Sequence, residues 1–220
     1  MSQREPQKAI SAYHDELIAI RRDLHAHPEP AYEETRTAER VGKLLESYGL
    51  EVQRGLGGTG LVATLNCGES NRAIGLRADM DALRMEEMNA FGHKSVNEGI
   101  MHACGHDGHT TMLLGAARYL AETKKFNGTV HFIFQPAEEG QAGAKRMMDD
   151  GLFKQFPMDS VFGMHNMPGQ PEGKFCMRPG PIMASGEVLT IKVLGKGGHG
   201  ARPEQTIDPV LAAAHMVTAL

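Results

Sequence analysis

The sequence has few of the features that mark several large protein classes. Its three cysteines, Cys67, Cys104 and Cys176, are too few and too widely spaced for a disulfide scaffold. No stretch approaches the roughly 20 consecutive apolar residues of a membrane span. The N-terminus is charged from the start and contains no apolar run of signal-peptide length. We therefore expect a cytoplasmic protein that does not associate with membranes.

An excess of basic charge is also missing. The formal net charge is −4, and the Lys and Arg residues are scattered along the chain. Binding to phosphate groups needs a basic face, so no nucleic-acid partner is expected. With 41% hydrophobic and 23% charged residues, and without repeats or low-complexity segments, the composition is that of an ordinary globular protein.

Helical and strand patterns alternate through most of the chain. Apolar residues recur at helical spacing over about 8–24, 33–48 and 107–122, and GAKRMMDDGLF predicts a further short helix. Short apolar runs predict strands in GLVATL, AIGLRAD, TVHFIF and DSVFG. The alternation predicts an α/β domain with a mostly parallel or mixed sheet flanked by helices.

The pattern changes at about residue 184. The segment EVLTIKVLGKGGHGARP alternates apolar residues before a glycine-rich turn, and Asp208-Pro209 suits the start of an apolar helix. A lone strand and half a helix cannot bury their own apolar faces. We therefore expect residues 1–183 to form one domain and residues 184–220 to begin a second one, inside which the chain stops.

Polar residues follow three of the predicted strands. Ligands bind beyond the carboxyl ends of the strands in such sheets, so residues at these ends are expected to act together. All of them are potential ligands or acid-base groups: Asp79 and Asp81, Glu138 and Glu139, His165 and Asn166.

One glycine separates Cys104 from His106, a spacing that lets a loop point a thiolate and an imidazole at one ion. The helix expected from about Asp107 would lower the pKa of the thiol through its N-terminal dipole and favour the ligating thiolate. A buried cysteine beside a helix cap is the simpler interpretation of this spacing alone. His102 and His109 lie nearby but do not decide between the two.

Glu138 and Glu139 are adjacent acids, which on a surface turn are usually a solvated pair. Here they follow a strand and Pro136. Since adjacent side chains point in different directions, one acid could bind a metal while the other faces the bound water as a general base. His165 would complete a set of S, N and O ligands that suits zinc, manganese, cobalt or nickel.

Other chemistries fit less well. GLGGTG at 55–60 and GKGGHG at 195–200 both match G-x-G-x-x-G, but the first precedes a strand and Pro203 blocks an immediate helix after the second. A dinucleotide site is therefore not expected. No G-x-S-x-G motif occurs, and Cys104 as a nucleophile would leave the adjacent acids and His165 unexplained.

Six motifs in order over nearly the whole chain resemble a known family. They are RADMDAL, MHACGHDGHTTMLLGAA, FIFQPAEEG, GLF, VFGMHN and GKGGHGARPEQTIDPV. Together they resemble the amidohydrolase branch of the aminoacylase and carboxypeptidase metallopeptidases, which includes hippurate hydrolase and indole-acetyl-amino-acid hydrolases. The resemblance implies a zinc-exopeptidase-like catalytic domain followed by an α+β ferredoxin-like lid. Through this lid the full-length protein is expected to form a homodimer or a higher homo-oligomer.

The resemblance also implies roles for individual residues. A centre of two divalent ions (Mn, Zn, Co or Ni) would be held by four ligands: Cys104, His106, Glu139 and His165. Glu138 would be the general base, and Asp81 would orient a ligating histidine. His199 would reach the partner's active site and steady the oxyanion. Asp79 receives no role.

The implied reaction is hydrolysis of N-acyl or N-aroyl amino acids, hippurate-like substrates first, to a carboxylic acid and a free amino acid. Two departures stand against simple transfer. Arg84 occupies a position where the family usually has proline, and the family continues past residue 220 to a last histidine ligand. The alternatives are an inactive metal-binding fragment or pseudoenzyme, and a dipeptidase or deacylase of the same fold.

Overall fold

A five-stranded mixed sheet organises the first of two units in this computed structural model, which describes residues 5–220. The described residues up to Gly169 form the first unit, and Gln170–Leu220 form the second. The first four residues of the charged N-terminus lie outside the described residues.

The strand order places three parallel strands side by side. The strands are β1 (Glu51–Leu56), β2 (Gly60–Cys67), β3 (Ala73–Asp79), β4 (Gly128–Gln135) and β5 (Ser160–Gly163), in the order β1-β2-β4-β3-β5. β2 pairs antiparallel with β1 and β4, whereas β3 pairs parallel with β4 and β5. The carboxyl ends of β3, β4 and β5 therefore meet at one edge, and the prediction of a mixed sheet is confirmed.

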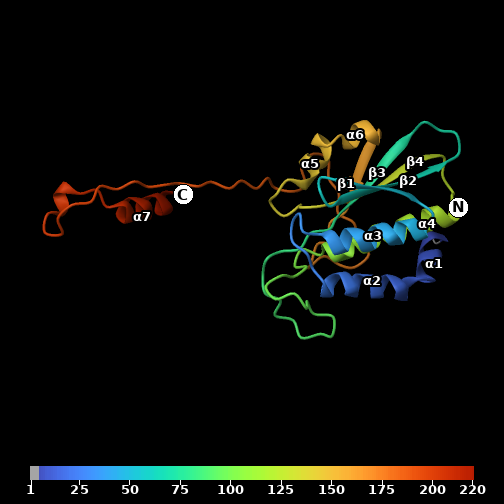
Figure 1. Ribbon diagram of the computed structural model, residues 1–220, viewed down its shortest axis with the longest axis horizontal. Helices are drawn as coiled ribbons and strands as arrows, with labels where there is room; N and C mark the ends of the chain where they lie inside the picture. Colours follow the sequence, from blue (N-terminus) through green and yellow to red (C-terminus); the bar gives the residue numbers. More distant parts are fainter. Residues whose placement is uncertain (1–4) are drawn as a thin grey trace. The chain divides into compact units, whose positions relative to one another are not determined.

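Helices cover both faces of the sheet (Figure 1). One group comprises α1 (Glu5–Ser11), α2 (His14–Ala26), α3 (Thr35–Ser47) and α4 (His106–Thr123); α5 (Gly143–Asp149) and α6 (Leu152–Gln155) lie on the opposite face. None of the helices in the described part of the chain has the length and apolarity that spanning a lipid bilayer demands.

The single helix expected over 8–24 is broken into α1 and α2. The break lies at Ala12–Tyr13, where the buried Tyr13 ring turns toward α4 and its hydroxyl donates a hydrogen bond to the Gly115 carbonyl oxygen at 3.2 Å. The apolar periodicity continues across this turn, so it does not reveal the break.

Alternate residues of the central strands supply two cores. Leu61 of β2 and Phe132 of β4 belong to the larger core under α2, α3 and α4, while their neighbours Val62 and Ile133 belong to the smaller core with Met147 of α5. This alternation follows from the period of two along a strand. Both faces are thereby buried, as expected for strands inside a sheet covered on two sides.

The second unit has little regular structure apart from a short 3-10 helix, Pro203–Gln205, and α7 (Pro209–Ala219). The side chain of Asp208 accepts the Val210 N–H at 2.8 Å, which confirms the expected N-cap. The strand expected around 189–193 is not formed in the described residues. A strand needs a partner for its backbone groups, and only the bridge between Lys196 and Ile207 is present in this unit.

We predict that Leu114→Ala lowers the free energy of unfolding by about 2–5 kcal/mol, because Leu114 is fully buried in the larger core and its loss leaves a cavity. Met112 lies on the same helix but is 44% exposed, so Met112→Ala should cost less than about 1 kcal/mol. Urea denaturation followed by circular dichroism measures both. Equal losses would contradict this account of the core.

Candidate metal centre

The predicted site residues of the first unit lie together at the edge where β3, β4 and β5 end. Cys104 precedes α4, and His106 is the first residue of that helix. Ligand atoms lie within 4.8 Å of one another in three groups: Cys104, His106 and His165; His106, Glu138 and Glu139; Asp79, His106 and His109. His106, which is fully buried, belongs to all three and is the centre of the cluster.

The His106 ring faces several acids. Its Nε2 lies 3.7 Å from Asp79 Oδ2, 4.0 Å from Glu138 Oε2 and 3.9 Å from Glu139 Oε1. On the other side of the cluster, Cys104 Sγ is 3.3 Å from His165 Nε2. Thiol, imidazole and carboxylate groups are thus close enough to share small cations.

Asp81 connects two members of the cluster. Its Oδ1 lies 3.3 Å from His106 Nδ1, and its Oδ2 accepts the backbone N–H of Glu139 at 2.9 Å. Burial raises the pKa of Asp81, but the hydrogen bonds from His106 and the Glu139 backbone outweigh it and hold the pKa below its usual value. An ionised Asp81 can therefore orient the imidazole and fix the Glu139 backbone at once.

The pKa of Cys104 moves in the direction opposite to the one expected from the helix. Burial, followed by the negative charge of Glu139, raises the pKa of Cys104 to about 12. The negative charges of Glu138 and Asp79 act in the same direction, so the expected lowering of this pKa was wrong. A metal that bound here would have to displace the thiol proton.

Asp79, which received no role from the sequence, connects the end of β3 through His109 to the residues that follow β5. Asp79 Oδ1 lies 2.6 Å from His109 Nδ1, and its Oδ2 accepts a hydrogen bond from Arg77 at 2.7 Å. Burial raises the pKa of Asp79, but the hydrogen bond from His109 and the charge of Arg77 lower it to about 2. His109 Nε2 in turn accepts the backbone N–H of Asn166 at 3.0 Å. This chain of contacts supports the backbone next to His165.

A histidine of α2 contacts the first turn of α4. His25 Nδ1 lies 3.0 Å from Asp107 Oδ2, and its Nε2 lies 3.1 Å from Glu87 Oε1. The hydrogen bond to Asp107 raises the pKa of His25, and although burial opposes it, Glu87 keeps the net shift upward. Sequence reasoning missed this network because its members are far apart along the chain and none belongs to a motif with the others.

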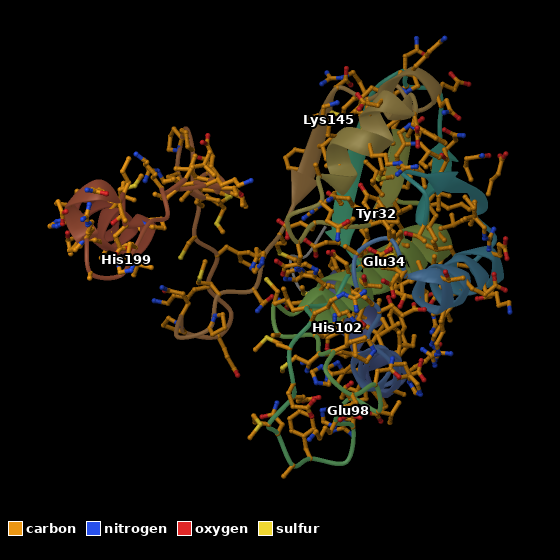
Figure 2. The ribbon with its side chains drawn as sticks, turned by 60° about the vertical axis from the view of Figure 1, so that its left-hand side comes forward. Tyr32, Glu34, Glu98, His102, Lys145 and His199 are labelled. Carbon is orange, nitrogen blue, oxygen red and sulfur yellow. The ribbon has the colours of Figure 1, made fainter. Side chains whose placement is uncertain are left out.

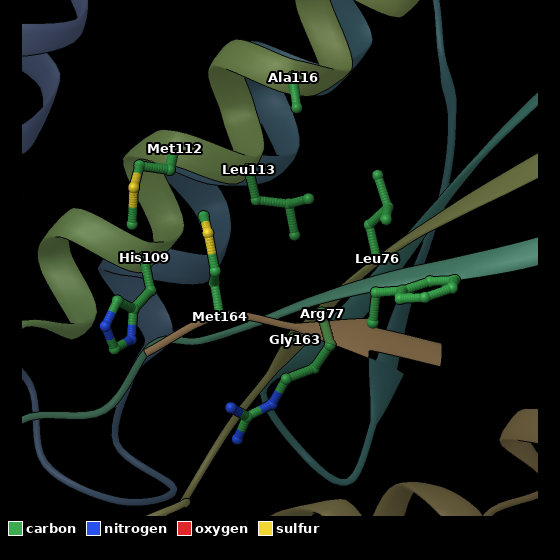
Figure 3. A pocket seen from close by; sticks show the side chains of 9 residues that line it. Leu76, Arg77, His109, Met112, Leu113, Ala116, Gly163 and Met164 are labelled. Carbon is green, nitrogen blue, oxygen red and sulfur yellow. The ribbon is translucent and has the colours of Figure 1, made fainter. Parts of the chain in front are cut away.

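An apolar hollow of about 200 Å³ lies beside the cluster, between α4 and the neighbouring strands β3 and β5 (Figure 3). His109 and Arg77 are the polar residues at its wall, and Met112, Leu113 and Met164 supply apolar surface. Cys104 and the two adjacent glutamates do not line it. The hollow is therefore a neighbour of the candidate centre and not the centre itself.

Comparison with known proteins identifies the family. The model of peptidase family M20/M25/M40 matches residues 75–219, which include every residue of the cluster. This chain belongs to peptidase family M20/M25/M40. The family resemblance noted in the sequence is confirmed.

Three similar proteins illustrate the relationship. The M20 chain is 49% identical over 205 residues to hippurate hydrolase of Campylobacter jejuni, which covers 93% of this chain and 53% of the relative. It is 41% identical over 223 residues to N-acyl-L-amino acid amidohydrolase of Geobacillus stearothermophilus, covering 100% of this chain and 60% of the relative. A solved dinuclear metal-binding M20 peptidase of Bacillus subtilis has a TM-score of 0.70 and 40% identity, covering 73% of this chain and 45% of that one. The M20 chain thus spans about half the length of the curated relatives it matches.

The donor set of this M20 chain fits divalent cations. Two buried atoms that face the cluster have no hydrogen-bond partner among the described residues: His106 Nε2 and Glu139 Oε1. Buried polar atoms are rarely left without a partner, and a bound cation would satisfy the histidine nitrogen and the glutamate oxygen. The S, N and O donors suit borderline metals better than magnesium or calcium.

His199 belongs to the second unit. Its Nδ1 accepts the backbone N–H of Ala201 at 3.2 Å, and its side chain is exposed. Its role at the oxyanion of a partner subunit stays a prediction, as do the individual roles of the other site residues.

We predict that Gly105→Ala weakens Co²⁺ binding at least tenfold. Gly105 has φ 89°, and an added Cβ would collide with the side-chain amide of Asn166, so the loop between Cys104 and His106 must move. A displacement that costs about 1.4 kcal/mol of binding free energy weakens affinity tenfold.

Gly99→Ala is the matched control, since Gly99 has φ 71° but nothing within 4 Å of an added Cβ. It should leave the Co²⁺ affinity within about threefold of wild type, or ~0.65 kcal/mol. Titration of the metal-free protein with Co²⁺ measures both variants, and equal affinities would contradict the prediction.

Proposed function

We propose that this protein hydrolyses the amide bond of N-acyl or N-aroyl amino acids, hippurate-like substrates first, with the help of two divalent ions. Cys104, His106, Glu139 and His165 would hold the ions, and Glu138 would be the general base. The products are a carboxylic acid and a free amino acid.

The two adjacent glutamates differ in their hydrogen bonding and in their exposure to solvent, and this difference is the observation that carries the proposal. Glu139 has a buried oxygen without a hydrogen-bond partner in the described part of the chain, and its backbone is fixed by Asp81. The Glu138 side chain is 41% exposed, compared with 25% for Glu139. These differences support Glu139 as the ion ligand and Glu138, which is more accessible to water and substrate, as the base.

The chemistry divides between the ions and the chain. Two divalent ions supply Lewis-acid activation of water and of the substrate carbonyl when they are bound. Glu138 takes a proton from the water molecule while the oxygen of that water attacks the carbonyl carbon. Glu138 then delivers the proton to the nitrogen of the departing amine. Asp81 holds His106 in orientation throughout, and His199 would donate a hydrogen bond to the developing oxyanion.

The names of similar proteins support this substrate class. One relative is a hippurate hydrolase and another is an N-acyl-L-amino acid amidohydrolase, and both align with more than nine tenths of the chain. The native metal among Mn, Zn, Co and Ni, the homodimer and the cytoplasmic location stay predictions.

Glu138→Gln should lower kcat for hippurate by about 10²- to 10⁴-fold, the range typical of losing a general base. Bound metal should remain near the wild-type amount, because Glu139 and the other ligands are unchanged. Release of glycine measures the rate, and elemental analysis measures the metal. Glu51→Gln, at an exposed position at the start of β1, is the control and should retain full activity.

Three other outcomes separate the alternatives. Full activity in Glu138→Gln contradicts the assigned base. A wild-type protein that binds metal but cleaves no amide in a substrate panel is a metal-binding protein without this activity. A preference for dipeptides or for acetylated substrates over hippurate indicates the dipeptidase or deacylase alternative.

Metal removal should destabilise the protein, because acids then surround His106 without a compensating cation. We expect addition of Mn²⁺ or Zn²⁺ to the chelator-treated protein to raise Tm, as ligand binding to the folded state requires. Mg²⁺ at equal concentration is the control and should have little effect, since it prefers oxygen ligands in octahedral geometry. An equal shift with all the ions would show that the S and N donors take no part.

A further inference from the structure

The segment between α2 and α3 contacts two of the strand ends that carry the candidate centre. The carbonyl oxygen of Glu29 accepts the N–H of Ala82 at 2.8 Å, next to Asp81. The Tyr32 hydroxyl donates to the Gln141 carbonyl oxygen at 2.8 Å, just after the adjacent glutamates. Figure 2 shows Tyr32 and Glu34 near each other in the first unit. No motif of the family resemblance includes this segment.

Glu34 is the buried acid of this segment. It is fully buried, its Oε1 accepts the N–H of Ala137 at 2.8 Å, and its Oε2 accepts the Thr59 hydroxyl at 2.5 Å. No basic side chain forms an ion pair with Glu34 within the described residues. A buried carboxylate without a counter-ion is costly, and burial raises the pKa of Glu34. Packing alone would favour an apolar residue at this position.

The residue that Glu34 holds is strained. Ala137 has φ 51°, in the left-handed region, where a side chain costs on the order of 1–2 kcal/mol. It is fully buried, and its carbonyl oxygen accepts the Gly143 N–H at 2.9 Å. Ala137 immediately precedes Glu138, so its backbone angles set the direction in which the two adjacent glutamates leave β4. Such a conformation persists only where its surroundings hold it.

We propose that Glu34 is the positioning residue for the catalytic turn: its carboxylate holds the backbone of Ala137 and thereby places Glu138 and Glu139 against His106. This inference rests on the proposed function of those two acids. Asp81 holds the Glu139 N–H from one side, and Glu34 holds the Ala137 N–H from another. The turn is thus fixed by two buried carboxylates that come from different parts of the chain.

The test compares substitutions at Glu34 with the same substitutions at Glu29. The Glu29 carboxylate also accepts two hydrogen bonds, from the N–H groups of Arg36 at 2.9 Å and Thr37 at 2.7 Å, but touches no residue of the catalytic turn. We expect Glu34→Leu to lower kcat for hippurate by about 10- to 100-fold with KM changed less than about threefold, because a small misplacement of a catalytic group has an effect of this size.

A second readout does not depend on catalysis. Glu34→Leu should also weaken Co²⁺ binding by the full chain and shift the visible absorption bands of bound Co²⁺, since Glu139 moves. Glu34→Gln should recover most of the wild-type values, because its amide oxygen can accept the Ala137 N–H while its NH₂ group donates to Thr59. Glu29→Leu should lower Tm but leave kcat and the Co²⁺ spectrum unchanged.

A Glu34→Leu protein with the kcat and the Co²⁺ spectrum of Glu29→Leu would overturn the inference. If Glu34→Leu does not fold, Thr59→Val carries the test, because losing the hydroxyl frees one carboxylate oxygen and should shift the spectrum to a smaller extent; an unchanged spectrum would overturn it. The proposed function is judged separately, on wild type and Glu138→Gln. If the proposed hydrolysis is wrong, wild type itself does not cleave hippurate, and if the assigned base is wrong, Glu138→Gln stays active. Failure of this inference alone leaves wild-type hydrolysis and the effect of Glu138→Gln intact.

Discussion

A buried imidazole surrounded by acids is the constraint on which the rest of this structure depends. Atoms of Asp79, Asp81, Glu138 and Glu139 all lie within 4.0 Å of the fully buried His106 ring. Asp79 and Asp81 are buried, and buried carboxylates are costly in the ionised state without nearby positive charge. Desolvation lowers the pKa of His106, but the hydrogen bond with Asp81 and the negative charges of Asp79 and Glu139 outweigh it and hold the pKa above its usual value. Divalent ions would supply such positive charge, which makes the cluster a candidate centre for cations.

The fold brings these acids together through strand direction. Because β3, β4 and β5 run parallel, the residues that follow them reach one edge, and α4 begins there with His106. Segments from elsewhere in the chain then hold the loops. His25 of α2 holds Asp107, and Glu34 holds Ala137. Short loops at a sheet edge have few packing contacts of their own, so buried hydrogen bonds from other elements are needed to keep their geometry.

Much of this arrangement could be predicted from local patterns. Apolar periodicity located α3, α4, β4 and β5 within a few residues, and the alternation of strands and helices predicted that their polar ends would meet. The predictions of helices and strands failed where the outcome depended on tertiary contacts, which apolar periodicity does not report. The apolar periodicity continues through the break at Tyr13. The alternating apolar residues around 189–193 form no strand, because no partner strand is present in the described residues. The expected low pKa of Cys104 was wrong in direction, since burial and the nearby carboxylates raise it.

The sequence by itself determined which chemical groups are available and their order: a cysteine and a histidine one residue apart, two adjacent acids after a strand, and a histidine after the next strand. It also determined the family, because the family's motifs are short stretches of consecutive residues that can be read directly from the sequence. Only the tertiary structure decided that Asp81 serves both His106 and Glu139, and that Glu34 holds the turn before Glu138. Contacts between residues tens of positions apart depend on chain direction and packing, which no local pattern encodes.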